Sequence, residues 1–214
     1  MTRAIGLFTV LSLAACSTDL GDPASPPPAT VRERLEAPTR LQVAAADSGG
    51  AVTAERKVGM GWETGLVDLG IENGELFVSS DARDALTVDG LQIVFKPLDI
   101  PDGVFGSTHA QLTNVRIDLM KEHRAPAVWT SDNEVHLTAM LDITLHWTLS
   151  LGGSPTPLGS PVLPPVPVEI VLTGDGEQVS AEIRAHAAGE LWSWAGLIKL
   201  SELTLVLGAD ATAP

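Results

Sequence analysis

The sequence predicts an all-β protein, formed mainly by an antiparallel meander that makes a sandwich, a barrel or a curled sheet. Three observations support this class: one long stretch with strict alternation of apolar and polar residues, two shorter stretches with the same alternation, and turn-forming residues between β-prone segments. The 214 residues, 44% of them hydrophobic, are enough for one sizeable domain with its own core.

The longest alternating stretch runs from Val135 to Leu151. Every odd position is apolar, and every even position except Met140 is polar. Because successive side chains of a strand point to opposite faces, the pattern gives one apolar and one polar face. A single strand of this length would span about 55 Å, whereas strands usually have about 3–10 residues. Its apolar face is the candidate surface for an apolar ligand, with these residues: Leu141, Ile143, Leu145, Trp147 and Leu149.

Turn-forming residues divide the chain before this stretch into shorter strands. Asn73-Gly74 and Asp89-Gly90 each lie between β-prone segments, and both dipeptides tolerate positive φ, so each is a predicted hairpin turn. A strand is predicted over 111–119. The polar segment 121–131 contains a proline, which favours a loop leading into the long strand.

Two more alternating strands, 166–173 and 179–187, follow the Pro- and Gly-rich loop 152–165 and complete the predicted meander. Helical spacing of apolar residues over 190–198 favours one short helix or a turn there, before a closing strand at 200–207. The two tryptophans of this segment are candidate interface aromatics at lipid headgroups or in a ligand pocket. The alternative is that they fill one end of the core. These residues are Trp192 and Trp194.

The first residues have the form of a secretory leader, with Arg3, a short apolar run and small residues. The only cysteine, Cys16, directly follows Leu13-Ala14-Ala15. This Leu-Ala-Ala-Cys sequence resembles the lipobox of bacterial lipoproteins. The resemblance implies cleavage before Cys16 and attachment of a diacylglyceryl group to it. It also implies that Ser17, in place of aspartate, favours sorting to the outer membrane of a Gram-negative cell.

The expected domain organisation follows from these features. Residues 1–15 form a lipoprotein signal peptide, and 16–38 form the lipidated N-terminus and a Pro- and Ser-rich tether. Residues 39–209 form a single β-rich domain, and 210–214 a disordered tail. Within the tether, Thr30-Val-Arg-Glu33 resembles a capping box that could start one helical turn.

Charge excludes one class of partner. The chain has 13 Lys and Arg against 27 Asp and Glu, a net charge of −14. Nucleic acids require clustered cations, so we expect no nucleic-acid partner. Tyrosine is absent and aromatic residues make up only 4% of the chain, which fits poorly with the aromatic girdles of a transmembrane barrel.

Catalytic and metal-binding motifs are missing from the sequence. It has no nucleophile elbow, no His-Glu-x-x-His, no phosphate-binding loop and no dinucleotide fingerprint. His136 and His146 share the polar face of the long strand but are ten residues apart, or about 33 Å, too far for one metal ion. Asp99 and Asp102 flank a turn, yet they lack the spacing of a calcium loop. We therefore expect no metal, no cofactor and no enzymatic activity.

Two functions remain open. The first is an outer-membrane-anchored envelope lipoprotein that acts as a structural or protein-interaction module, with the apolar strand face as its core. The second is a carrier for a lipid or another apolar ligand held by that face. In both cases the membrane partner is contacted through the N-terminal lipid.

Overall fold

The computed structural model describes residues 29–81, 85–100, 108–157, 164–175, 178–193 and 196–211. Within these ranges, one short α-helix, one 3-10 turn and fourteen strands make up the fold, and every pair of neighbouring strands is antiparallel. The predicted all-β class is confirmed.

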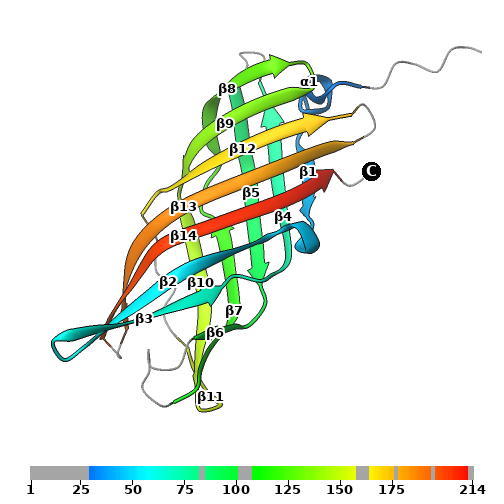
Figure 1. The fold of residues 1–214 in the computed structure, drawn as a ribbon. Coiled ribbons are helices and arrows are strands. Elements are labelled where there is room, and N and C mark those ends of the chain that lie inside the picture. Colours follow the sequence, from blue (N-terminus) through cyan, green and yellow to red (C-terminus); the bar gives the residue numbers. More distant parts are fainter. Residues whose placement is uncertain are drawn as a thin grey trace, which may run out of the picture.

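Eight strands close into a barrel in the order β5-β4-β1-β14-β13-β12-β9-β8, because β8 pairs again with β5 (Figure 1). The bounds of these strands are β1 (Thr39–Val43), β4 (Ile71–Ser80), β5 (Ala85–Phe95), β8 (His123–Ser131), β9 (Glu134–Leu141), β12 (Val166–Gly174), β13 (Val179–Ser193) and β14 (Gly196–Ala211). The predicted meander is confirmed, since β9, β12 and β13 are neighbours.

The other strands extend the barrel at one end. There the neighbour of β14 changes from β1 to β2, and β2 forms a hairpin with β3. The neighbour of β5 likewise changes from β8 to β7, and β7 also pairs with β6 and β10. Strand β11 pairs with β10 at the edge of the sheet. The bounds of this second set are β2 (Gly49–Val58), β3 (Gly61–Asp68), β6 (Leu98–Ile100), β7 (Ala110–Leu119), β10 (Ile143–Leu151) and β11 (Ser154–Pro157).

The predicted single long strand is two strands, interrupted at Asp142. Its alternation of faces is correct: odd positions such as Val135, Leu141 and Ile143 are buried. The two parts differ in their neighbours, because β9 pairs with β8 and β12 whereas β10 pairs with β7 and β11. The amide of Met120, just after β7, donates to the carbonyl of Asp142 where the neighbours change.

Both predicted hairpin turns lie inside strands. Strand β4 continues through Asn73-Gly74 and β5 through Asp89-Gly90, and each dipeptide lies beside a shift in register between the two strands. These are β-bulges, where an extra residue fits into one strand. The predicted loop 121–131 is also wrong, because its residues from His123 onward form β8. Pro126 is the last residue of β8 paired with β5, and pairing with β9 starts at the next residue.

The predicted short helix at 190–198 is wrong. Strand β13 continues to Ser193, β14 starts at Gly196, and these two residues pair with each other. The helical spacing of apolar residues therefore coincides with a β-hairpin, whose residues 194–195 lie outside the described part of the chain.

Helix α1 (Val31–Arg34) is the predicted capped turn. The Thr30 hydroxyl accepts from the amide of Glu33, and the Glu33 carboxylate accepts from the amide of Thr30. The helix packs onto the barrel, because Val31 and Leu35 are 1% and 0% exposed and the amide of Ser80 donates to the carbonyl of Leu35. The segment predicted as the end of the tether is thus part of the folded body.

Among the residues whose burial is described, one continuous apolar cluster lies inside the barrel, and no polar or charged residue is buried. A second, smaller cluster of Ile100, Ala110 and Leu149 lies between β6, β7 and β10. In the described ranges, no helix has the length and apolar content needed to cross a membrane.

Candidate functional site

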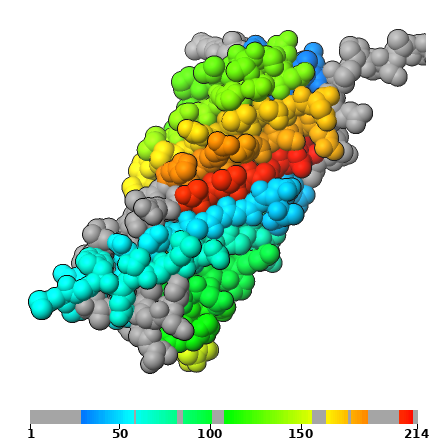
Figure 2. Space-filling view, viewed as in Figure 1, coloured from blue at the N-terminus to red at the C-terminus, as the bar shows by residue number. Residues whose placement is uncertain are grey.

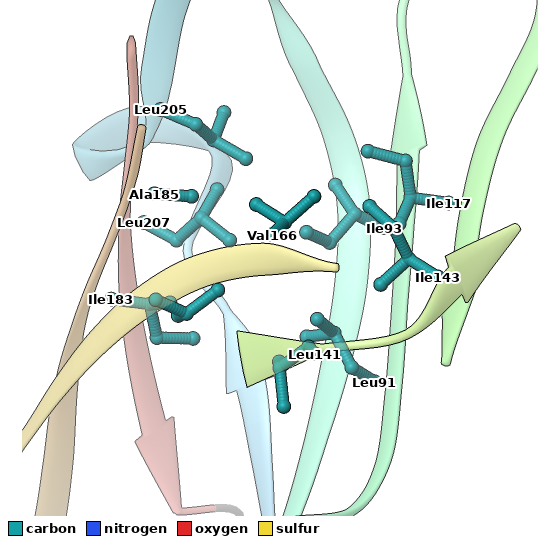
Figure 3. Close-up of a pocket in the computed structure, with 11 residues that line it drawn as sticks. Leu91, Ile93, Ile117, Leu141, Ile143, Val166, Ile183, Ala185, Leu205 and Leu207 are labelled. Atoms are coloured by element: carbon teal, nitrogen blue, oxygen red, sulfur yellow. The ribbon is translucent and has the colours of Figure 1, made fainter. Parts of the chain in front are cut away.

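The interior of the barrel contains a small apolar cavity at the level where β9 gives way to β10. Eleven apolar side chains line it, and no polar residue contributes to the lining. Side chains of β13 and β14, including Ala185 and Leu205, lie on one side, and Ile93, Ile117 and Ile143 lie on the other (Figure 3). The cavity has a volume of about 50 Å³.

The size of this cavity limits what it holds. Pockets that bind small molecules usually measure about 300–1,000 Å³. The cavity of about 50 Å³ accommodates a few heavy atoms at most. An acyl chain would therefore enter only after the lining side chains or the strands had moved apart.

The five residues of the predicted ligand face do not form one site. Leu141 and Ile143 line the cavity, and Leu145 packs in the same core cluster. Leu149 belongs to the second cluster, and Trp147 is partly buried against the main core. Because the strand is interrupted at Asp142, its apolar face is shared between two sets of neighbours.

The polar face of β9 and β10 carries ion pairs. The Nε2 atom of His136 lies 2.7 Å from Oε1 of Glu134, and this hydrogen bond, together with one from Thr130, lowers the pKa of the Glu134 carboxyl below its ordinary value. His146 lies 3.0 Å from an oxygen of Asp118 on β7. The two histidines thus have separate carboxylate partners.

No metal site is found among the residues that the structure describes, because no group of three or more His, Cys, Asp or Glu side chains could hold an ion. Asp99, one of the two candidate calcium ligands, is exposed and accepts from the amide group of Gln111. Asp102, its proposed companion, lies outside the described residues.

The hairpin of β2 and β3 has an apolar outer surface that sequence reasoning missed. Met60 at its turn is fully exposed, and Trp62 and Leu66 on β3 are 43% and 62% exposed. The hairpin, cyan in Figure 2, projects from one end of the molecule. The sequence contained a partial signal, since Gly59-Met60-Gly61-Trp62 places two large apolar residues next to closely spaced glycines.

The remaining predicted site residues are placed only in part. Trp192 lies on β13, where its backbone pairs with Leu197 of β14. Cys16 and Trp194 lie outside the described residues. No known family model matches the chain, and no curated protein matches it.

Proposed function

We propose that the chain is a non-enzymatic envelope lipoprotein, anchored to the outer membrane through a lipid on Cys16, whose β-barrel acts as a structural or protein-interaction module. The observation that carries this proposal is that, among the residues whose side chains the structure describes, apolar side chains of the chain itself pack together inside the barrel. Its main core cluster is continuous, and the cavity within it measures about 50 Å³.

The filled interior supports a module because a carrier needs space for its cargo. Eight-stranded barrels have an interior that side chains can just fill, or that can hold one small ligand. Here leucine, isoleucine and valine side chains from opposite walls leave room for only a few atoms. The apolar strand faces then serve stability rather than binding.

Native mass spectrometry of the Cys16→Ala protein, purified without detergent, tests this choice. We expect the mass of the bare polypeptide, and an organic extract of the same sample without lipid. A lipid that copurifies in equimolar amount would contradict the module and support the carrier.

The anchor is tested separately by cell fractionation. Wild type is expected in the outer-membrane fraction and the Cys16→Ala variant in the soluble fraction, because two or more acyl chains make attachment stable. Ser17→Asp is the matched control: it keeps the cysteine and is expected to leave the protein membrane-bound while reducing its sorting to the outer membrane. Wild type found soluble with an unmodified Cys16 would contradict the proposed anchor.

A carrier of a lipid or other apolar ligand is the second candidate, and the chemistry of the cavity lining, in contrast to its volume, favours it. The cavity is lined only by apolar side chains, at the level where the barrel strands exchange neighbours. This candidate requires a bound ligand in the experiment above and displacement of that ligand by Ala185→Trp.

A further inference from the structure

Two hairpins end side by side at the end of the molecule opposite α1 (Figure 1). Strand β14 pairs with β13 on one edge and with β2 on the other, and its Ile198 lies opposite Arg56. In the next row, Trp192 pairs with Leu197, and Lys57 pairs with Trp62. We call the region formed by residues 56–63 and by the backbone of 192–193 and 196–198 the distal end.

The side chains described at the distal end are unusually apolar for an exposed hairpin turn. Met60 is fully exposed between two glycines, and Trp62, 43% exposed, follows directly. Exposed single apolar residues are common, but here two large ones lie within three positions at a projecting turn.

Charge also distinguishes the distal end from the rest of the chain. Residues 56–63 contain two cations, Arg56 and Lys57, and one anion, Glu63, so this segment has a net charge of +1 in a chain of net charge −14. Lys57 lies directly across from Trp62. Tryptophan is enriched at the boundary between lipid chains and water, where a lysine can keep its ammonium group in the headgroup layer.

The small size of the apolar surface argues against a protein partner. A stable protein interface buries about 800 Å² on each side. One buried tryptophan contributes about 150–250 Å². Even with Met60 and Leu66 added to Trp62, the exposed apolar surface of the hairpin is smaller than one side of such an interface. Shallow insertion into a lipid surface requires no matching partner surface and suits a narrow apolar turn.

We propose that the distal end inserts Met60 and Trp62 into the headgroup region of the bilayer that holds the lipid on Cys16. This inference rests on the proposed lipid anchor. The twelve residues 17–28 can span at most about 43 Å, and the 16 residues of β14 extend over about 53 Å. The distal end thus reaches the bilayer of its own anchor when the barrel lies on its side, and the anchor keeps it at high effective concentration there.

Vesicle binding of the Cys16→Ala protein tests the insertion without the anchor. We expect weak binding to phosphatidylcholine vesicles by sedimentation, and at least a tenfold lower partition coefficient when Met60→Ser and Trp62→Ser are added. Met140→Ser with Val128→Ser is the matched control, because it removes two exposed apolar side chains from the barrel wall, and its partition coefficient should not change. Thermal unfolding of each variant verifies that it is folded.

The lipidated protein tests whether the turn enters the bilayer that holds its own anchor or a different bilayer. A fluorophore on a Met60→Cys variant, reconstituted through its anchor, should be quenched by brominated phosphatidylcholine in the same vesicle. Quenching only by brominated lipid in a second vesicle population would overturn insertion into the anchor's own bilayer.

The outcomes separate the two proposals. If Cys16 carries no lipid but the Cys16→Ala protein binds vesicles through Met60 and Trp62, the anchor fails and lipid insertion by the turn stands. If the anchored protein shows no quenching, or if vesicle binding is the same with and without the two serines, the insertion is wrong. If the Met60→Ser and Trp62→Ser substitutions abolish binding to a purified envelope protein but leave vesicle binding unchanged, the turn binds a protein partner instead.

Discussion

At the scale of single residues, Gly74 determines how closely three strands of the barrel approach one another. A Cβ atom at this position would lie 2.8 Å from the carbonyl oxygen of Gln92 on β5 and 3.0 Å from a side-chain carbon of Val43 on β1. Gly74 is buried on β4 between these two strands. Both neighbours would have to move to admit even a methyl group.

Gly74→Ala is therefore expected to lower the free energy of unfolding by about 1–3 kcal/mol, the usual cost of overpacking a core. Urea denaturation followed by circular dichroism measures the change. Gly49→Ala is the matched control, because a Cβ there would have only one neighbour, at 3.9 Å. It should change the free energy by less than about 0.5 kcal/mol. Equal stability of the two variants would show that the strands at Gly74 are less closely packed than described.

The same residues explain why the turns were predicted in the wrong places. Asn73-Gly74 and Asp89-Gly90 satisfy the local preference of a hairpin turn, but a glycine also suits a bulge and a close approach of strands. At the bulge in β4, Glu72 and Asn73 are both exposed while Ile71 and Gly74 are buried. Only the neighbouring strands distinguish the two outcomes, and a single sequence does not contain them.

At the scale of elements, α1 shows how a short helix is stabilised by packing. A helix of four residues would be unstable alone, because the first turn of a helix is costly to form. The capping box satisfies amides at its start, and Asn133 accepts from the amide of Val31. Leu35 adds an apolar contact at the other end of the helix, with 0% of its side chain exposed.

Leu35→Ala is expected to lower the free energy of unfolding by about 2–5 kcal/mol, because it leaves a space in the core. Glu36→Ala, at the next and exposed position, is the control and should have little effect. Thermal and urea unfolding measure both. If Leu35→Ala is no more destabilising than Glu36→Ala, residues 30–35 belong to the tether and not to the folded body.

For the strands, the buried face was predicted correctly, but the place where one strand ends and the next begins was not. Alternation correctly identified the buried face of 135–151, because the period of side chains continues through Asp142. The interruption at Asp142 was not predictable, since it depends on contacts with the segment after β7. There the amide of Met120 donates to Asp142, and Lys121 lies 2.8 Å from its carboxylate.

At the scale of the whole molecule, the barrel and its apolar interior follow from the pattern of alternation, but the place of the candidate sites does not. Leu141 and Ile143 were identified from the sequence and do line the cavity. The exposed pair Met60 and Trp62 was missed, because a sequence does not show which hairpin projects. Position in the assembled sheet, rather than residue type, decides between core and surface there.

The cavity provides a last test of whether the barrel is filled by its own side chains. Ala185 is the smallest of the lining residues, and the cavity of about 50 Å³ has space for the two extra carbons of valine. In a ligand-free module, Ala185→Val should raise the free energy of unfolding by about 0.5–2 kcal/mol, as cavity filling usually does.

Ala139→Val is the matched control for this variant. Ala139 is also buried, at 3% exposed, but it does not line the cavity, so the added carbons should overpack the core and cost about 1–3 kcal/mol. Urea denaturation of both variants, with and without prior organic extraction, gives the comparison. If Ala185→Val destabilises the protein as purified but stabilises it after extraction, a ligand occupies the cavity in the cell, and the barrel is a carrier.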